Sequence, residues 1–491
     1  MAIVFILFLT LLLAALSPSL SSSPTFVNID CGSNSTFADG VFLWLPDVYS
    51  YVQNGDSHVV QYTDPVPRYM SRTAMSTLRA FPTLKKNCYT VNVVKGQKLL
   101  VRASFFYGNY DGKNSPPTFD LHFDGNFWAT VNTTGVRGVY HEAIYVNKKN
   151  TTSVCVAQIF KDQVPFISGL EIRSLEMSMY SHVDSGRALF LSNRVNAGAN
   201  FSTRYPYDAY DRIWRAQGGF FSVDNVVNKA PSIDTSKAEN QPPLTVLRTA
   251  IKTTGTSRGI VLNTDLPTNG ESVYITAYFS EITRLLPNQT RSVQVYKNIV
   301  PYSQLVVPPF GSVSELHITN MTANSNTILA VFAAKSSNLP PLLNAYEVYT
   351  VSGALTDGTN SDDVKRLAAL QREFKVLQKW SGDPCLPSSF SWEWLECNSD
   401  ASPRVTKLNL GSFGLSGMLP DLSSMTELET IDLHNNSLFG PIPSFLGSLP
   451  KLKLLCEIKR HREQEGGINV DNHTLFVIAS VTLFLLQLKN L

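Results

Sequence analysis

Short apolar segments separated by turn signals fill the first part of the chain. Turn-forming pairs occur between them, at Lys95-Gly96, Asp111-Gly112 and Asp124-Gly125. The segments lack the 3.6-residue periodicity of an amphipathic helix. Many short strands with such spacing indicate an all-β sandwich or jelly roll, which we predict over residues 26–175. The predicted strands are residues 89–94, 98–106, 118–123, 153–160 and 169–175.

The pattern of this first part recurs further along the chain. The segment VRASFFYGNYDG, which starts at Val101, resembles VYITAYFSEITR, which starts at Val273. A second pair of similar segments aligns Glu171 with Glu347 at a similar offset. A near-constant offset over two separate stretches favours an internal duplication, with chance similarity between generic strands as the alternative. The duplication predicts a second sandwich over residues 190–352.

A helical pattern replaces the strand pattern after residue 360. The apolar positions that share one face of residues 362–380 are Val364, Leu367, Leu370, Phe374 and Leu377. The segment WSGDPCLPSSFSWEWLEC follows, and its two cysteines, Cys385 and Cys397, are predicted to form a disulfide. Together the helix and the Trp-rich segment predict a cap over residues 360–400 for the repeats that come next.

Residues 403–455 carry a leucine-rich pattern that occurs twice. The repeated positions are Leu408, Leu410 and Leu415 in the first copy and Ile431, Leu433 and Leu438 in the second. Each copy predicts a strand whose leucines enter a solenoid core, and Asn436 lies where an asparagine ladder would satisfy backbone groups. Since such arrays usually need three or more repeats, we expect a short leucine-rich-repeat segment that is stabilised by packing against its cap.

Both ends of the chain are apolar. The run at residues 3–16, followed by small residues and Pro18, predicts a secretory signal peptide over residues 1–23, with a buried N-terminal helix as the alternative. Residues 456–491 form a polar segment and an apolar tail whose final run is shorter than the roughly 20 residues of a spanning helix. This tail resembles a GPI-anchor signal, and a short membrane anchor or a truncated product are the alternatives.

Glycosylation sequons and cysteines fit the secretory pathway, with an extracellular or plasma-membrane-associated location. Seven sequons are predicted N-glycosylation sites: Asn34, Asn132, Asn150, Asn200, Asn288, Asn320 and Asn435. An eighth, Asn472, adjoins the apolar tail and is a weaker candidate. The pairing of the remaining cysteines, Cys31, Cys88, Cys155 and Cys456, is left open because connectivity does not follow from sequence.

Composition narrows the functional classes. Hydrophobic residues make up 43% of the chain and charged residues 16%, so large cores are favoured over disorder. A net charge of +2 gives no basis for binding nucleic acid. No Cys-x-x-Cys pair or zinc-ligand spacing occurs and the eight histidines are scattered, so neither a metal nor a cofactor is predicted.

Several motifs, in their order and combination, give the chain a family resemblance. They are IDCG from Ile29, DG at Asp39, LRAFP from Leu78, NCYTV from Asn87, PFISGLEIR from Pro165, RYPYDAYDRIW from Arg204 and WSGDPC from Trp380. The chain resembles the malectin-like, leucine-rich-repeat receptor proteins of plants. The resemblance implies a mainly β protein with two tandem malectin-type jelly-roll sandwiches followed by a short leucine-rich-repeat segment. We expect a kinase-lacking form, because no Gly-rich phosphate loop or HRD-type motif is present.

The resemblance also implies non-catalytic binding. Animal malectin binds glucose disaccharides, and some plant relatives bind secreted peptides. The first hypothesis is therefore a receptor-like module that recognises glucose or a cell-wall oligosaccharide. The alternative is a peptide- or protein-binding co-receptor ectodomain that partners a receptor kinase. No Gly-x-Ser-x-Gly elbow or His-Glu-x-x-His helix is present, and we predict no enzymatic activity.

Candidate sugar-binding residues follow from the chemistry of pyranose rings. Their C–H faces stack on aromatic side chains, and their hydroxyls need carboxylates and amides. The candidates are Trp44, Tyr107, Asn109, Tyr110, Asp111 and Asp162. Four of them share the segment FFYGNYDG, and the resemblance places Asp162 where malectin has a binding aspartate. Core packing is the alternative for Tyr107 and Trp44. The segment YFSEITRL lacks this aromatic cluster, so any sugar site is expected in the first half.

Overall fold

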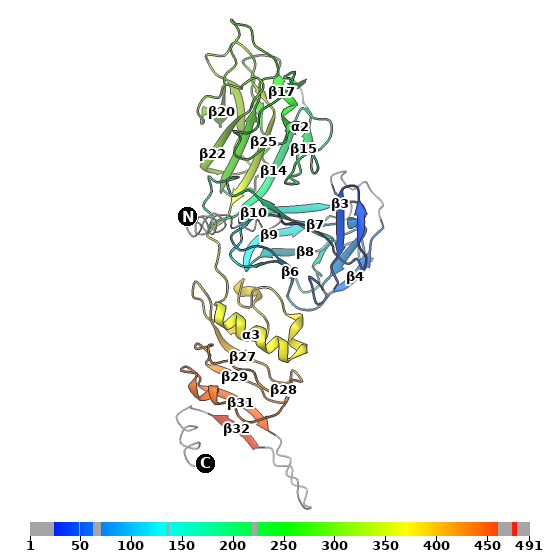
Figure 1. The fold of residues 1–491 in the computed structure, drawn as a ribbon, viewed down its shortest axis with the longest axis vertical. Helices are drawn as coiled ribbons and strands as arrows, with labels where there is room; N and C mark the ends of the chain where they lie inside the picture. The colour runs from blue at the N-terminus through cyan, green and yellow to red at the C-terminus, as the bar shows by residue number, and fades with distance from the viewer. Residues whose placement is uncertain are drawn as a thin grey trace, which may run out of the picture.

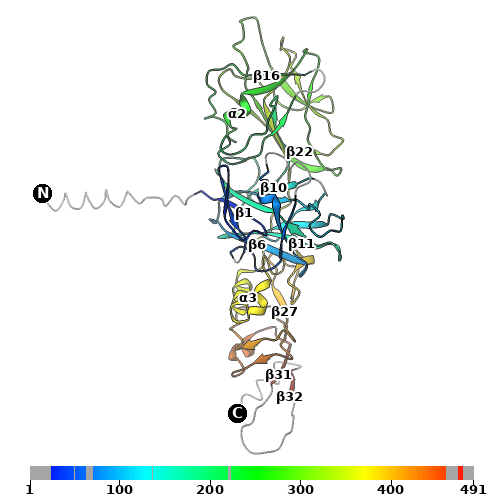
Figure 2. The same ribbon diagram turned by 90° about the vertical axis from the view of Figure 1, so that its right-hand side faces the viewer.

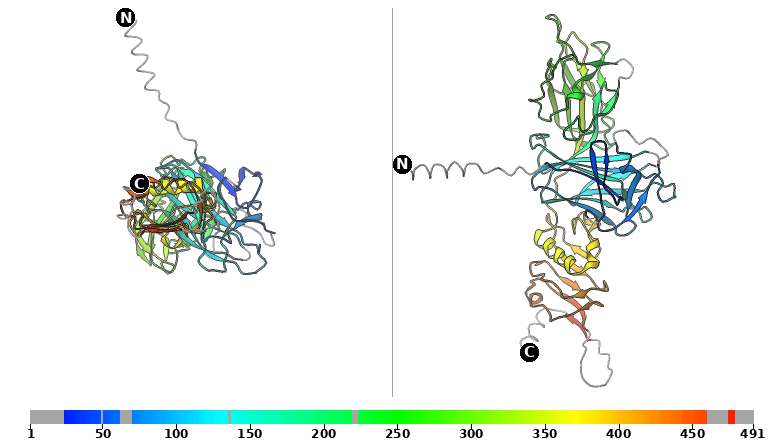
Figure 3. Two further views of the ribbon diagram at one scale, coloured as in Figure 1. Left: turned by 90° about the horizontal axis from the view of Figure 1, so that it is seen from below. Right: turned by 45° about the vertical axis from the view of Figure 1, so that its right-hand side comes forward.

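The computed structural model describes residues 24–48, 50–61, 70–134, 137–218, 223–459 and 474–478. The predicted signal peptide, the Asn472 sequon and most of the apolar tail lie outside these residues. Within them, no helix is long and apolar enough to cross a membrane. Three bodies follow one another along the long axis of the molecule (Figures 1 and 3). We call residues 26–175 the first half, residues 189–351 the second half and residues 361–459 the C-terminal body. The first half lies in the middle.

The first half is built from two larger sheets and a small one. One large sheet begins with the order β2-β3-β1-β13-β7-β10, and the other has the order β6-β11-β8-β9. The strands of the first are β2 (Phe37–Asp39), β3 (Phe42–Pro46), β1 (Phe26–Asp30), β13 (Gly169–Leu175), β7 (Lys98–Phe105) and β10 (Val139–Val146). Those of the second are β6 (Lys86–Asn92), β11 (Thr151–Ala157), β8 (Thr118–Phe123) and β9 (Asn126–Asn132). The small sheet joins β12 (Phe166–Ile167), β5 (Thr77–Ala80) and β4 (Asp56–Val59), and a 3-10 turn covers Ala74–Ser76.

Strand β7 is buried on both faces, which explains why apolar side chains occupy both of its alternating sets of positions. Leu99, Val101 and Phe105 point into the core of the first half. Side chains of a strand alternate between faces, so Leu100 and Arg102 point the other way. Leu100 belongs to a cluster that contains residues of the second half, such as Tyr349. One face of β7 therefore packs into the core of the first half, and the other face packs at the joint between the two halves.

The second half continues the same large sheet. Strand β14 pairs with β10 through Ala143↔Phe190 and Ile144↔Leu189, so the complete sheet has eleven strands. The added strands are β14 (Leu189–Ala197), β25 (Ala345–Val351), β19 (Glu271–Phe279), β22 (Ser314–Ala323) and β15 (Arg215–Gln217). The order β14-β25-β19-β22 matches β1-β13-β7-β10 position by position, so both halves show one order of neighbours.

Two smaller sheets and a short helix complete this half. One sheet contains β16 (Val223–Val227), β17 (Thr249–Thr253) and β24 (Leu342–Leu343). The other contains β18 (Ile260–Val261), β23 (Leu329–Ala333), β20 (Val293–Lys297) and β21 (Val300–Pro301). Helix α2 (Leu244–Leu247) precedes β17. Buried Val, Ile, Leu and Phe side chains of both sheets and β19 form a separate apolar core for this half.

A network of buried charges fills the joint between the halves. Its cations are Arg102, Arg173, Arg194, Arg204 and Arg212, and its anions are Glu142, Glu171, Asp208, Asp211 and Glu347. Glu142 bridges the halves, because its two carboxylate oxygens lie 2.8 Å from Arg102 Nη2 on β7 and 2.6 Å from Arg194 Nη2 on β14. Arg204, Asp208, Asp211 and Arg212 all come from the RYPYDAYDRIW motif. The motif thus supplies much of the charge that holds the joint.

The C-terminal body combines a helix with a parallel ladder of short strands. Helix α3 (Ser361–Glu373) is capped by Asn360, whose side chain accepts a hydrogen bond from the Asp362 backbone. The remaining elements are 3-10 turns at Lys375–Lys379, Ser388–Phe390 and Ser444–Ser448, and strands β26 (Leu395–Cys397), β27 (Val405–Asn409), β28 (Ser416–Gly417), β29 (Thr430–Asp432), β30 (Ser437–Leu438), β31 (Leu454–Lys459) and β32 (Thr474–Ile478). The continuous helix predicted over 362–380 is wrong, because Phe374 is extended and a 3-10 turn follows it.

Asn436 links the two leucine-rich copies. Its side-chain oxygen accepts from Leu415 N at 2.9 Å, and its amide donates to Leu410 O at 2.8 Å and Leu433 O at 2.9 Å. The repeated apolar positions of both copies are buried in one cluster with Trp392 and Trp394 of the preceding segment, except for Leu438, which is partly buried and packs against this cluster. Backbone groups that the turns would leave unpaired are therefore satisfied by one side chain.

The C-terminal body docks under the first half rather than the second (Figure 2). Buried Lys86 of β6 donates hydrogen bonds from Nζ to Asp383 O at 2.7 Å and Leu386 O at 2.6 Å. Burial lowers the pKa of this lysine to about 8. A disulfide joins Cys88 of β6 to Cys155 of β11, and Ser381 Oγ donates to Cys88 O.

A second disulfide, Cys385–Cys397, closes the Trp-rich segment itself. Cys31 and Cys456 are free thiols among the described residues. Cys31 is buried in the core of the first half. Pairing Cys88 with Cys155 resolves the odd set of three cysteines, since those two residues are register partners on adjacent strands.

We predict that Glu347→Gln strongly destabilises the protein. The Glu347 carboxylate is fully buried and accepts hydrogen bonds from Arg194 Nε at 2.7 Å and Tyr278 Oη at 2.6 Å. Removing one partner of a buried ion pair typically costs about 3–5 kcal/mol. Denaturant titration should show this loss, whereas Asp265→Asn, which breaks the exposed pair with Arg215, should cost less than about 1 kcal/mol. Equal effects for the two variants would contradict a controlling role for the buried charges.

We also predict that Asp30→Asn flattens the dependence of stability on pH. Burial raises the pKa of Asp30 from 3.8 to about 7, despite the hydrogen bond donated by Thr77. The folded state then binds more protons than the unfolded state between these values, so this group's contribution is full below about pH 4 and is lost toward pH 7. Thermal melts from pH 4 to 8 should show a smaller decline for Asp30→Asn than for the wild type. Asp56→Asn, at an exposed position of β4, should leave the decline unchanged.

Candidate functional site

The loop after β7 holds four of the six sugar-binding candidates in a fixed conformation. Gly108 has φ +48°, and a Cβ at this position would lie 2.0 Å from the Val60 side chain. Asn109 follows with φ +55°. Its side-chain oxygen accepts from Asn114 N at 2.8 Å, and Gly112 N donates to its carbonyl at 3.1 Å. The loop is thus held by its own hydrogen bonds before any ligand arrives.

Tyr107 acts within this loop as a support. It is 1% exposed, so its ring faces are covered by protein. Its hydroxyl donates to Asp111 Oδ1 at 2.5 Å and accepts from Ser115 N at 3.3 Å. Burial and the bond to Asp111 raise the pKa of Tyr107 to about 12, so the hydroxyl stays protonated and able to donate. Tyr107 therefore orients Asp111 and offers no stacking surface of its own.

Tyr110 is the aromatic candidate that reaches solvent, since its side chain is half-buried. Its ring centroid lies 4.8 Å from His58, 5.7 Å from Phe166 and 5.7 Å from Tyr107. Burial raises the pKa of Tyr110, which keeps its hydroxyl neutral. His58 on β4 and Phe166 on β12 were not expected at this site. Only the fold brings them together with the loop, and no local sequence signal marks them.

The polar candidates lie at the surface around this ring. Asn109 is exposed and Asp111 is half-buried. Asp162 is exposed in a turn between β11 and β12. Gln163 in that turn accepts a hydrogen bond from Thr118 N, at the start of β8 and the end of the candidate loop. The structure therefore ties the Asp162 turn to the strand into which the candidate loop leads.

Trp44 does not belong to this surface. Its side chain is 2% exposed on β3, and its ring stacks on Phe37 with centroids 6.3 Å apart. A ring buried in this way cannot stack on a sugar, so the expectation for Trp44 is corrected in favour of the core role. Its indole nitrogen lies buried without a hydrogen-bond partner among the described residues.

The predicted glycosylation sites are all accessible. Asn34, Asn132, Asn150, Asn200, Asn288, Asn320 and Asn435 are exposed. Exposure is required for a bulky glycan at the folded surface, and none of these seven positions would bury one. That these seven asparagines carry glycans stays a prediction.

Comparison with known proteins identifies the family of this fold. The family model for the malectin-like domain matches residues 29–351, which include both halves of the eleven-stranded sheet. The chain belongs to the malectin-like domain family. This family is not a catalytic one.

The relatives of this malectin-like chain are plant receptor proteins. A probable LRR receptor-like serine/threonine-protein kinase of Arabidopsis thaliana, PAM74, is 33% identical over 427 residues. The match covers 83% of this chain and 47% of that protein, so the chain spans about half the length of this curated relative. The kinase domains of such relatives are not part of the match.

Solved structures share the malectin-like fold. The extracellular domain of ANXUR1 from Arabidopsis thaliana matches with a TM-score of 0.57 at 15% identity, covering 67% of this chain and 97% of that one. A crystal structure of the plant peptide RALF23 in complex with FER and LLG2 matches with a TM-score of 0.55 at 16% identity, covering 67% and 96%. These likenesses show that the chain shares the fold of a plant receptor extracellular domain.

Proposed function

We propose that this malectin-like chain is a non-catalytic, cell-surface binding module whose first half recognises carbohydrate through the loop after β7. One observation carries the proposal: the buried Tyr107 hydroxyl fixes Asp111 beside the half-exposed ring of Tyr110. A ring that reaches solvent can stack on a pyranose face, while Asp111 and Asn109 can bind hydroxyls. Asp162, in the neighbouring turn, would add a second carboxylate.

The architecture supports such a role. Under this proposal the two halves are tandem jelly-roll sandwiches, and the parallel ladder with its Trp-rich cap is a short leucine-rich-repeat segment. The protein then acts as a receptor-like protein that can partner a receptor kinase. Stacking and hydroxyl recognition require rigid groups, and the internal hydrogen bonds of the loop provide this rigidity.

Carbohydrate binding is tested by Tyr110→Ala. Isothermal titration with glucose disaccharides and cell-wall oligosaccharides should show binding by the wild type and an affinity at least tenfold weaker in the variant, since stacking is lost. Tyr302→Ala, which removes an exposed tyrosine of the second half, is the matched control and should bind as the wild type does. Tyr107→Phe should weaken binding as well, because it releases Asp111. A folded, glycosylated protein that binds no oligosaccharide in this panel would overturn the carbohydrate proposal.

A second candidate function is peptide and co-receptor binding. The observation that favours it is an open cavity of about 310 Å³ beside the joint between the halves. Its lining includes Lys98 and Ile144 of the first half, Arg187 before β14, and Asp184 and Ser185 of the connecting segment. One of the similar solved structures is a complex of the plant peptide RALF23 with FER and LLG2. A charged cavity at a joint can hold an extended peptide with both basic and acidic side chains.

Peptide binding is tested with Ser185→Arg, which places a long side chain in the cavity. Surface plasmon resonance with RALF23 and LLG2, singly and together, should detect binding by the wild type and at least a tenfold loss in the variant. Ser389→Arg, at an exposed serine of the C-terminal body, is the control. Binding that Ser185→Arg leaves intact would exclude this cavity as the peptide site.

A further inference from the structure

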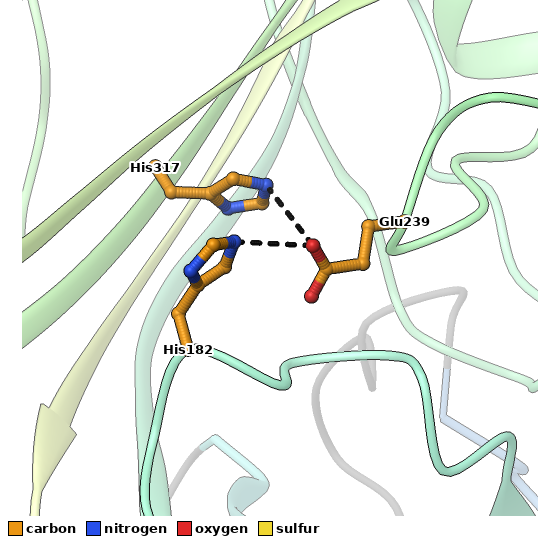
Figure 4. A group of neighbouring side chains, drawn as sticks. All are labelled: His182, Glu239 and His317. Atoms are coloured by element: carbon orange, nitrogen blue, oxygen red, sulfur yellow. Dashed lines mark ion pairs between the residues drawn. The ribbon is translucent and has the colours of Figure 1, made fainter.

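Three side chains from separate segments converge beside the joint. His182 lies in the segment between β13 and β14, Glu239 lies in the segment before α2, and His317 is on β22. His182 Nε2 is 3.1 Å from Glu239 Oε2, and His317 Nε2 is 4.0 Å from the same oxygen (Figure 4). One ligand atom from each residue lies within 4.8 Å of the other two. Such a set of two imidazoles and one carboxylate is typical of a site for a divalent transition metal.

Neighbouring groups orient His317 toward this point. Its Nδ1 lies 3.2 Å from both Tyr274 Oη and Thr276 Oγ1 on β19. When Nδ1–H donates to these hydroxyl oxygens, Nε2 carries the lone pair that a metal needs. Metal-binding histidines commonly have their second nitrogen hydrogen-bonded in this way. The side chain is 15% exposed, so its orientation is set by packing as well.

The Glu239 carboxylate is oriented too. Its Oε1 accepts hydrogen bonds from Ser181 N at 3.1 Å and Ser181 Oγ at 2.5 Å, which leaves Oε2 directed toward the two imidazoles. The backbone nitrogens of Glu239 and Asn240 donate to the Glu315 carboxylate at 2.6 Å and 3.0 Å. A second carboxylate therefore lies next to the cluster, with Glu315 Oε2 3.7 Å from His317 Nε2. Two nearby negative charges favour a dication at this position.

The cluster is poorly satisfied by protein contacts alone. A distance of 4.0 Å between His317 Nε2 and Glu239 Oε2 is too long for a hydrogen bond. The two imidazole rings are tilted by 37° with centroids 4.4 Å apart, so both rings lie beside the same carboxylate oxygen. A metal ion between the three ligand atoms would accept the lone pairs of the two histidine Nε2 atoms and bind the Glu239 carboxylate. Bonds of about 2.0–2.1 Å place tetrahedral ligands roughly 3.3 Å apart, so ligand atoms that lie within 4.8 Å of one another would move together by up to about 1.5 Å on binding.

We propose that His182, Glu239 and His317 bind a Zn²⁺ ion that ties the segment between the halves to the second half. The His182 side chain is 44% exposed, so the ion can enter from solvent and keep water as its fourth ligand. The ion would join the connecting segment to β22 and to the segment before α2. Because these elements border the joint, bound zinc restrains the relative orientation of the halves. This proposal does not rest on the carbohydrate or the peptide proposal.

The experiment uses the full chain without a histidine tag, with Cys456→Ser in every sample so that this free thiol does not bind metal. After dialysis against a chelator, Zn²⁺ is titrated by calorimetry, and Co²⁺ is added as a spectroscopic probe of tetrahedral coordination. We expect one equivalent of Zn²⁺, visible Co²⁺ absorption bands and a higher Tm with Zn²⁺ but not with Mg²⁺.

His182→Ala and His317→Gln should each weaken Zn²⁺ binding at least tenfold and abolish the Co²⁺ bands. The matched control is His434→Ala, which removes a histidine–carboxylate pair of similar exposure, His434 with Asp432, that has no second imidazole. If His317→Gln does not fold, His182→Ala decides, since its ring is exposed and makes few contacts. Zinc binding that His182→Ala leaves unchanged, or that His434→Ala reduces equally, would overturn the proposal, as would a wild-type protein that binds no zinc.

Discussion

The joint between the two halves depends on one balanced network of buried charges. Each ion on its own would lose several kcal/mol of hydration, so the arrangement is stable only when cations and anions meet with good geometry. Glu142 meets this condition by sharing its two oxygens between Arg102 of the first half and Arg194 of the second. Apolar packing would tolerate sliding, whereas these pairs do not. The network therefore selects one relative orientation of the halves, and the cavity proposed for a peptide depends on that orientation.

Local sequence patterns predicted the positions of several strands, but they did not indicate which strands pair with one another. The predicted segment 98–106 is β7 (Lys98–Phe105), and 118–123 and 169–175 coincide with β8 and β13. Segments 89–94 and 153–160 were displaced by two or three residues, because strand ends are set by pairing as well as by pattern. The continuation of one sheet across β10 and β14 rests on only two register pairs, which no periodicity reveals. Recognition of the RYPYDAYDRIW motif pointed to a family, and only the fold shows that its charges are buried.

For the candidate site too, local sequence indicated the loop, whereas the surroundings of each side chain depend on the fold. The loop with Asn109, Tyr110 and Asp111 could be found from composition, since aromatic and polar groups alternate around glycines. Whether a ring faces solvent or core depends on tertiary packing, and this separated Tyr110 from Trp44. The two histidines and the glutamate beside the joint lie too far apart in sequence to form a recognisable spacing. Their convergence follows from the position of β22 at the end of the sheet and from the segments that cover it.

Strand β7 connects these regions mechanically. At its start, Lys98 donates from Nζ to Met177 O at 2.9 Å and to Met179 O, and thereby holds the segment that carries His182. Its centre carries Arg102, and its end leads into the loop of Tyr107. Eight residues of strand span roughly 25 Å, so the candidate loop and the segment that carries His182 lie at opposite ends of one stiff, doubly buried element, with Arg102 of the joint between them. A ligand on the loop and an ion or partner at the joint would thus act on the same strand, and changes in the joint can reach the loop only through its packing.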